Sequence, residues 1–424
     1  MKLLKWLYPG LRVKRWLLLI IIGLMVIGFG VTSISGQLFL QVDHGLSKML
    51  YTLIGRDFPA LGGIVTVFLG LLLLTLGLRQ IFKSLRVSLW PGSNEALVDI
   101  LYQRRVLKNG PRIVVLGGGT GLSVLLRGLK TYTSNITAIV TVTDDGGSSG
   151  RLRTELGVLP PGDIRNCLVA LADKETVMEE VLSYRFKQGQ GLTGHSLGNL
   201  LLVALSEMAG GFVHAIQELS KVLAVRGQVL PATLAQAVLC AEMMDGQMVE
   251  GETQITGLKG HIKRVYLKPS NPQPVDESLK AIAQAEAIIL GPGSLYTSII
   301  PNLLVEGIVE AIRQSRGKKI YICNVMTQPG ETDGYTASDH LQAIYEHCGC
   351  NLVDYIIVNN RLALRKQLKK YETQGAYPVK VNTQGLAKLG VGVVQENLLD
   401  QSDLVRHNPQ RLAQTVINLI ISNE

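Results

Sequence analysis

Two long runs of apolar residues stand near the start of the chain. The first covers residues 16–31, with no charged residue before Asp43, and the second covers residues 60–78. A helix of about 20 apolar residues is long enough to cross the hydrocarbon core of a bilayer. We therefore predict a membrane hairpin at residues 1–89, with two transmembrane helices and a short external loop.

Basic residues flank this hairpin and give it an orientation. Five lysines and arginines precede the first run, and three follow the second. Because such residues favour the cytoplasmic side, both termini and the soluble part are predicted to lie in the cytoplasm. The expected location is the cell (inner) membrane, as a multi-pass protein with the lipid bilayer as a partner. A cleaved signal peptide, with small residues at 33–35, is the alternative for the first run, but the second run weakens it.

After a linker at residues 90–111, short apolar runs alternate with stretches of helical spacing. The runs at residues 112–116, 136–142, 285–290, 319–325 and 353–360 are apolar at successive positions. This is typical of strands buried on both faces of a parallel sheet. With helices between them, they predict an α/β fold over residues 112–424, a Rossmann-like doubly wound, mostly parallel sheet. Residues 157–251 are predicted to be mostly helical, including residues 230–244.

Charge and cysteine content exclude some functions. Residues 1–110 hold 13 Lys+Arg and 4 Asp+Glu, which leaves 29 of each kind in the rest of the chain. The whole formal charge of +9 therefore lies in the first quarter, and the balanced remainder argues against a nucleic-acid partner. The five cysteines include no C-x-x-C pair, which favours reduced thiols over a metal site.

Glycine-rich turns follow two of the predicted strands and open helices. Glycine permits close backbone approach, and a helix N-terminus presents free N–H groups to an anion. Two such turns on one sheet predict a phosphate-binding cleft at a topological switch point. A plain strand-to-helix turn is the alternative for the first, which matches neither the dinucleotide fingerprint nor the P-loop. The candidate ligand residues in these turns are Gly117, Gly118, Gly119, Thr120, Gly121, Gly291, Gly293 and Ser294.

The segment VTDDGGSSGRLR places Asp144 and Asp145 at the end of the second strand, on the same sheet edge. One acid there could bind ribose or sugar hydroxyls. The other could bind Mg²⁺ or accept a proton from a substrate hydroxyl, and Asp145 is the candidate catalytic residue. The small residues 146–150 are predicted to form a flexible loop that closes over phosphate. A solvent loop with helix caps is the alternative.

Further polar segments supply the remaining candidates. Adjacent side chains diverge, which argues against a nucleophilic pair of His195 and Ser196. Gln328 and Glu331 follow Asn324 in a polar loop that could line the same cleft. The other candidate ligand residues are Ser148, Ser149, Arg151, Asp163, Arg165, Asn166, His195, Asn199, Asn324 and Thr327.

Six ordered segments resemble one family, the gluconeogenesis-factor (YvcK-like) branch of the phospholactate transferase (CofD-like) superfamily. They are RIVVLGGGTGLSVLLRGLK, VTDDGGSSGRLR, PPGDIRNCLVAL, TGHSLGNLLL, LGPGSLYTSIIPNLLV and CNVMTQPGETDGYT. The resemblance implies a nucleotide-binding fold whose transferase members move a phospholactyl group from a guanylyl donor to a deazaflavin hydroxyl, with Mg²⁺. For this branch it implies UDP-sugar binding, cell shape and gluconeogenic growth, with no firm reaction. It carries over the two glycine turns, the acidic pair and Asn199. The membrane hairpin departs from the common cytosolic form.

Three functions follow from these observations. The first is a membrane-anchored regulator that binds a UDP-sugar and is linked to gluconeogenic growth, cell-envelope synthesis and cell shape. Cell-envelope enzymes and a second copy of the chain are its candidate partners. The second is a Mg²⁺-dependent transferase that acts on a nucleotide-activated phospholactyl-type donor. The third is an NAD-dependent oxidoreductase, which lacks the sixth-position glycine and a clear acid/base pair for hydride transfer.

Overall fold

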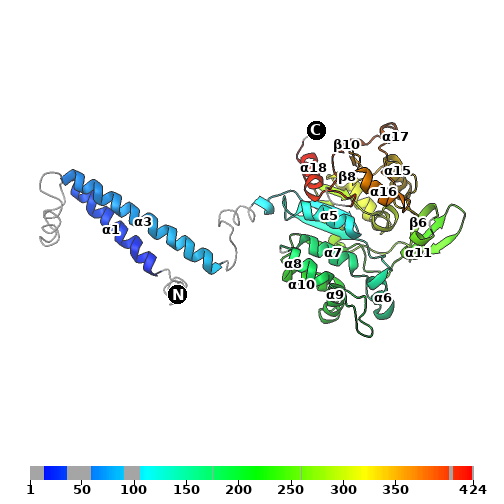
Figure 1. Ribbon diagram of the computed structural model, residues 1–424, viewed down its shortest axis with the longest axis horizontal. Coiled ribbons are helices and arrows are strands. Elements are labelled where there is room, and N and C mark those ends of the chain that lie inside the picture. The colour runs from blue at the N-terminus through cyan, green and yellow to red at the C-terminus, as the bar shows by residue number, and fades with distance from the viewer. Residues whose placement is uncertain are drawn as a thin grey trace. The chain divides into compact units, whose positions relative to one another are not determined.

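The computed structural model describes residues 14–35, 59–89, 106–173, 175–258, 260–400 and 404–422. The chain forms two compact units, Met1–Tyr102 and Gln103–Glu424, each of which is described by itself (Figure 1). Most of the linker predicted at residues 90–111 lies outside the described residues.

The first unit contains helices α1 (Lys14–Ser35) and α3 (Pro59–Leu89), which pack side by side (Figure 1). Glycines spaced seven residues apart form the contact: a Cβ at Gly70 would lie 2.5 Å from Ile27 Cγ1 and 2.8 Å from the carbonyl oxygen of Gly23. Among the described side-chain environments of this unit, the buried positions are all glycines, namely Gly23, Gly30, Gly63, Gly70 and Gly77. Many large apolar side chains, Met25 and Phe68 among them, are exposed instead.

One stretch of α3, Gly62–Ser84, is long and apolar enough to cross a membrane. The apolar part described in α1, Arg15–Val31, is shorter, and two bent helix pairs of the second unit pass the same test only if each pair counts as one span. Of the two predicted transmembrane helices, only α3 is therefore long and apolar enough, within the described residues, to cross a membrane. The predicted external loop falls on residues outside the description.

The second unit is built on a seven-stranded sheet of order β10-β9-β8-β7-β1-β2-β3, in which every pair of neighbours is parallel. The prediction of a doubly wound parallel sheet is confirmed, and the five predicted strands correspond to β1, β2, β7, β8 and β9. The strands are β1 (Ile113–Gly117), β2 (Ile136–Val140), β3 (Gln228–Pro231), β7 (Ala287–Leu290), β8 (Lys318–Ile322), β9 (Tyr355–Asn359) and β10 (Gly392–Glu396).

Two hydrophobic cores cover the two faces of this sheet, because alternate residues of a strand point to opposite faces. Ile113 and Val115 belong to the core that contains α5 (Gly119–Leu129), α7 (Gly162–Leu171), α9 (Leu197–Met208), α10 (Phe212–Val222) and α18 (Pro409–Ile421). Val114 and Leu116 belong to the core that contains α12 (Asp276–Gln284), α14 (Ile308–Gln314) and α15 (Ala337–Cys348). The further helix α8 (Glu175–Ser183) packs against α7 and α9. The five cysteines are free, as reduced thiols require.

A small antiparallel sheet of order β5-β4-β6 lies beside the second core. Its strands are β4 (Val238–Met243), β5 (Met248–Glu250) and β6 (Ile262–Lys268). The predicted helix at residues 230–244 is therefore wrong, because these residues form the end of β3 and all of β4. Leucine and alanine favour a helix locally, but pairing with β6 buries Leu239 and Ala241 completely, and this packing overrides the local preference.

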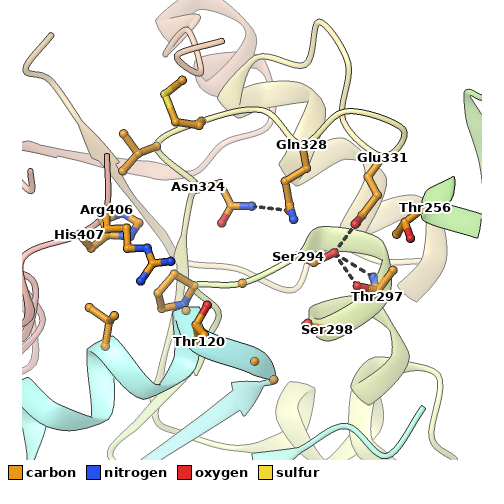
Figure 2. Close-up of a pocket in the computed structure, with 18 of the residues that line it drawn as sticks. Thr120, Thr256, Ser294, Thr297, Ser298, Asn324, Gln328, Glu331, Arg406 and His407 are labelled. Carbon is orange, nitrogen blue, oxygen red and sulfur yellow. Dashed lines mark hydrogen bonds between the residues drawn. The ribbon is translucent and has the colours of Figure 1, made fainter. Parts of the chain in front are cut away.

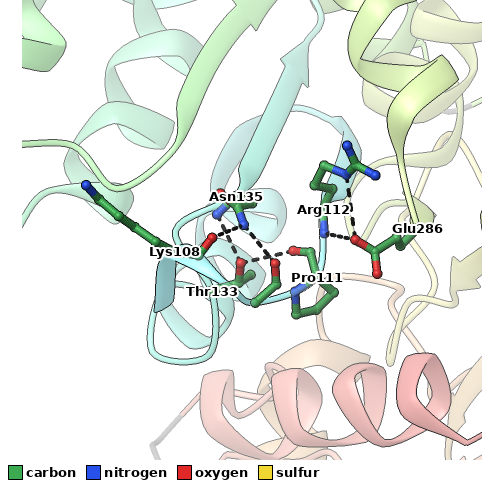
Figure 3. Close-up of polar contacts among 7 residues, drawn as sticks. Lys108, Pro111, Arg112, Thr133, Asn135 and Glu286 are labelled. Atoms are coloured by element: carbon green, nitrogen blue, oxygen red, sulfur yellow. Dashed lines mark hydrogen bonds and ion pairs between the residues drawn. The ribbon is translucent and has the colours of Figure 1, made fainter. Parts of the chain in front are cut away.

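Hydrogen bonds fix the start of the second unit at the amino ends of β1 and β7 (Figure 3). The Asn135 side-chain amide donates to the carbonyl oxygens of Lys108 at 2.9 Å and Gly110 at 2.7 Å. The Arg112 backbone N–H donates to Glu286 Oε1 at 3.0 Å. The carboxyl ends of the strands, where the glycine turns lie, form the opposite edge of the sheet.

Candidate functional site

The two glycine turns meet at the carboxyl ends of β1 and β7. β1 leads into α5, whereas β7 leads through Ser294 into a π-helix (η2, Leu295–Ile299) and α13 (Ile300–Leu303). From these neighbouring strands the chain continues in opposite directions across the sheet, so they flank the expected topological switch point. The turns touch closely: a Cβ at Gly121 would lie 2.7 Å from the Pro292 carbonyl oxygen.

A cavity of about 370 Å³ opens at this meeting point. Figure 2 shows Arg406 and His407 on one side of it and Ser294, Thr297 and Glu331 on the other, with Asn324 and Gln328 between them. Its described lining consists of Gly118, Gly119, Thr120, Gly121, Val124, Glu252, Thr256, Pro292, Gly293, Ser294, Thr297, Ser298, Asn324, Val325, Met326, Gln328, Glu331, Val405, Arg406 and His407. Seven of the residues singled out as ligand candidates from sequence are among them: Gly118–Gly121, Gly293, Ser294 and Asn324.

The first turn of α5 faces this cavity without an acidic residue or a side-chain cap. Gly119 has φ of +64°, and a Cβ there would point into open space. This conformation favours glycine and leaves room for a ligand against the backbone. Arg406 is the only lysine or arginine among the described lining residues, so it is the side chain that can neutralise a phosphate.

Carboxylates already occupy part of both helix N-termini, which the sequence did not indicate. Asp163 accepts a hydrogen bond from the Gly119 backbone N–H, and Glu331 accepts one from the Tyr296 backbone N–H and one from the Ser294 hydroxyl. Helix N-termini attract negative charge, so these contacts are favourable. A phosphate would therefore bind beside these positions, at Thr120, Gly121 and Arg406, rather than at the helix starts themselves.

Burial raises the pKa values of the carboxyl groups in and beside the cavity, and repulsion between carboxylates adds to the effect at Asp163 and Glu252. Burial, together with Asp144, raises the pKa of Asp163 to about 6. Burial, with repulsion from Asp144, Asp163 and Glu331, raises the pKa of Glu252 to about 9, and burial raises the pKa of Glu331 to about 7. Near neutral pH, Glu252 is therefore a hydrogen-bond donor as well as an acceptor, which suits a hydroxyl-rich ligand.

The acidic pair separates, as the turn at Gly146 allows. Asp144 Oδ1 accepts from the Gly146 backbone N–H at 2.9 Å. Asp145 Oδ1 instead accepts from the Thr253 backbone N–H at 2.9 Å and from its hydroxyl at 2.6 Å, at the start of α11 (Glu252–Gly257). Neither residue lines the cavity, and Asp145 anchors a helix. Its catalytic role and the metal role of the pair stay predictions.

The acidic residues do not form a ready-made metal site. Within the described ranges, no group of three or more histidine, cysteine, aspartate or glutamate side chains could hold a metal ion. Asp145 points to Thr253, which leaves Asp144 without its predicted companion. Asp144 and Asp145 therefore do not turn their carboxylates toward one ion, and the Mg²⁺ that the family resemblance implies stays a prediction.

The small residues 146–150 form a helical turn rather than the predicted flexible loop. Gly146 is the N-cap and the other four open α6 (Gly147–Leu156), where Gly150 is required because a Cβ there would lie 1.8 Å from the Asp145 carbonyl oxygen. Ser149 Oγ accepts from the Gly162 backbone N–H at 3.1 Å, and Arg151 donates to the Thr193 carbonyl oxygen at 2.8 Å. These contacts hold α6 in place, outside the cavity.

A buried polar network connects the other sequence candidates. Arg165 donates to Asn199 Oδ1 at 2.8 Å and also bonds Ser196 and Asn166. Asn199 Nδ2 donates to Ser148 Oγ, which lies 2.9 Å from His195 Nδ1. This network positions the starts of α6, α7 and α9 behind the cavity.

Other candidates also lie away from the cavity lining. Thr327 Oγ1 accepts a hydrogen bond from the Tyr377 backbone N–H at 3.0 Å. Gly117 and Gly291 belong to the turns but do not line the cavity themselves.

Several cavity residues were not found from the sequence, above all Arg406 and His407. They precede α18, which packs against α5 so closely that a Cβ at Gly128 would lie 2.1 Å from the Pro409 carbonyl oxygen. This packing brings the C-terminal segment to the switch point. Nothing in the local pattern around Arg406 signals it. Glu252 and Thr256 reach the cavity in the same way, through the placement of α11.

Comparisons with known proteins give a consistent result. Residues 113–399 match the family described as 2-phospho-L-lactate transferase CofD. The gluconeogenesis factor of Bacillus subtilis is 51% identical over 311 residues, which cover 73% of this chain and 98% of that protein. The gluconeogenesis factor of Halalkalibacterium halodurans is 55% identical over 306 residues, which cover 72% and 95%. A curated relative from Nostoc sp. is 49% identical over 420 residues, or 97% of this chain and 91% of that protein. A crystal structure of a Bacillus halodurans protein, with 54% identity, superposes with a TM-score of 0.71 and covers 73% of this chain and 100% of its own.

Proposed function

Because the chain belongs to the CofD-like family and has gluconeogenesis factors as relatives, we propose that its second unit binds a nucleotide sugar of the UDP-sugar type and acts as a regulator. The regulation is linked to gluconeogenic growth, cell-envelope synthesis and cell shape. Cell-envelope enzymes, and a second copy of the chain, are the partners through which it would act.

The chemistry of the cavity supports a ligand with both phosphates and hydroxyls. Arg406 offers a positive charge to a diphosphate, and Thr120 and Gly121 offer the open first turn of α5. Glu252 and Glu331 can exchange hydrogen bonds with sugar or ribose hydroxyls. A volume of about 370 Å³ lies within the range of small-molecule sites.

The single observation that carries this proposal is the placement of Arg406 beside the exposed first turn of α5. Losing one charged hydrogen bond typically costs about 1.5–3 kcal/mol, or roughly tenfold to a hundredfold in affinity. We expect Arg406→Ala to weaken binding of UDP-N-acetylglucosamine by that factor, measured by calorimetry on residues 103–424. Arg316→Ala, an exposed arginine that does not line the cavity, is the matched control. Equal affinities of the two folded variants would contradict the proposal.

A transferase is the second candidate, because two acids beside the cavity have pKa values suited to proton transfer. Asp163, with a pKa of about 6, could accept a proton near neutral pH, and Glu252 could donate one. Chromatography of the nucleotide after prolonged incubation with the protein separates the two functions. Recovery of intact nucleotide sugar, with and without added acceptor alcohols, favours the regulator. The oxidoreductase has no comparable support.

We also propose that α1 and α3 form a transmembrane hairpin with both ends in the cytoplasm. Helix pairs in lipid pack through small residues, because apolar side chains are as well solvated by lipid as by protein. The buried glycines and exposed apolar side chains of this pair follow that rule, with Met25 and Phe68 about 70% exposed. The length of α3 supports the same proposal.

The topology is tested by proteolysis of intact spheroplasts. A protease added outside should spare the second unit, and it should digest that unit once the membrane is permeabilised. Digestion in intact spheroplasts would refute the proposed orientation.

A further inference from the structure

A short exposed segment at residues 361–372 concentrates positive charge. It contains α16 (Arg365–Glu372), which has no buried residue, and the turn before it. Its five basic side chains are all exposed, none of them forms an ion pair within the described residues, and Glu372 is its only acid. The five are Arg361, Arg365, Lys366, Lys369 and Lys370. Among the described residues, no ion pair therefore neutralises these five side chains.

Apolar side chains accompany the charge. Leu362 is 80% exposed and Leu364 is 70% exposed, although leucine is normally buried. On the other side of the helix, Leu368 and Tyr371 pack against a small core formed by Val325, Met326 and Val405. The inner side of α16 is thus attached to the domain, while its cations and two leucines remain free to contact something else.

We propose that residues 361–372 form a docking surface for an anionic lipid bilayer. Acidic headgroups attract clustered lysine and arginine, and exposed leucines can enter the boundary between headgroups and acyl chains. Charge alone would fit any acidic surface, but the two leucines favour a bilayer. The chain also carries a helix long enough to cross a membrane, and the choice of a bilayer rests in part on the proposed hairpin, which would keep this unit near one.

Docking at this surface would place one wall of the ligand cavity beside the membrane. The Tyr371 hydroxyl accepts a hydrogen bond from the Val405 backbone N–H at 3.2 Å, and Val405 precedes Arg406 in the cavity wall. If fully extended, the 16 residues between α3 and position 106 would reach about 53–58 Å. The inference goes beyond the proposed function, because it does not require the ligand.

The test measures sedimentation of residues 103–424 with vesicles. This unit is compact, and the solved relative corresponds over its whole length to 73% of the present chain, so it is expected to fold without the hairpin. Vesicles of equal parts phosphatidylcholine and phosphatidylglycerol should bind the protein, and phosphatidylcholine alone should not. Binding should weaken steeply with salt, because the screening length falls from about 10 Å at 0.1 M to about 3 Å at 1 M.

A charge variant and its matched control decide the outcome. Each basic residue near an anionic surface accounts for about a fivefold change, so the double variant Lys366→Glu, Lys370→Glu should lose at least about tenfold in partitioning. The double variant Lys280→Glu, Arg316→Glu changes the charge equally at exposed positions elsewhere and should bind as the unmodified unit does. Equal binding of the two charge variants, or no binding to anionic vesicles at low salt, overturns the proposal.

A third variant, Leu362→Ser with Leu364→Ser, tests the bilayer itself. It keeps every charge, and it should bind anionic vesicles several-fold less. Unchanged binding would mean adsorption by charge alone, as on any acidic surface, and would overturn the bilayer as the occupant. Thermal unfolding of each variant confirms that it is folded before its binding is compared.

Discussion

Replacing Glu331 by glutamine should remove a pH dependence of stability that arises inside the ligand cavity. Glu331 is 6% exposed and receives hydrogen bonds from the Ser294 hydroxyl and the Tyr296 backbone. Burial raises its pKa from an ordinary value of 4.5 to about 7. Glutamine has the same shape and can still accept from Ser294, but it cannot ionise, so the substitution isolates the charge.

The sign follows from which state holds the proton more tightly. The folded protein keeps the Glu331 proton up to a higher pH than the unfolded chain, so ionisation opposes folding. Stability is therefore highest below the unfolded-state pKa and falls as pH rises from about 4.5 to about 7. The difference between these pKa values corresponds to about 3 kcal/mol. Most of that loss is expected between pH 5 and pH 8.

Chemical denaturation of residues 103–424 at pH 5 and pH 8 measures the effect. The unmodified unit should lose more stability between these two pH values than the Glu331→Gln variant, by about 2–3 kcal/mol. Asp163 and Glu252 act in the same direction in both proteins, so the difference reports on Glu331 together with its repulsion of Glu252. Glu277→Gln, the same substitution at an exposed glutamate of α12 outside the cavity, is the matched control. An identical pH dependence for Glu331→Gln and the unmodified unit would refute the reasoning.

Further predictions concern the turns, the acidic pair and the hairpin. Gly121→Ala should lower both stability and ligand affinity, because its Cβ would lie 2.7 Å from the Pro292 carbonyl oxygen. Thermal unfolding and calorimetry measure the two effects, and a variant with unchanged stability and affinity would contradict the close contact of the turns. Asp145→Ala should cost about 1.5–3 kcal/mol of stability through the lost Thr253 contacts, while ligand affinity per folded molecule stays near normal. A loss of affinity without a loss of stability would instead favour a role of Asp145 in catalysis. Gly70→Leu should separate α1 from α3, because the leucine side chain would collide with the opposite helix. Cysteine cross-linking between the two helices in membranes should then fall, and unchanged cross-linking would contradict the glycine contact.

The sequence by itself determined those strands and turns that a short residue pattern specifies. Five runs of successive apolar residues correspond to β1, β2, β7, β8 and β9, because a strand buried on both faces needs apolar residues at every position. The two glycine turns were located for a similar reason, since few residues other than glycine tolerate a positive φ or backbone contact at van der Waals distance. That the two glycine turns meet at the switch point was expected from the sequence, because alternating strands and helices predict a doubly wound sheet.

Only the tertiary structure decided which polar side chains meet. Residues 230–244 have the composition of a helix, yet they supply β4, because Leu239 and Ala241 are completely buried when β4 pairs with β6. Asp144 and Asp145 look equivalent in sequence, but the turn at Gly146 sends them to different partners. Arg406 reaches the cavity because Gly128 lets α18 pack onto α5. A local pattern specifies secondary structure through its periodicity, whereas a site depends on contacts between segments far apart in the chain, and such contacts leave no periodic signal.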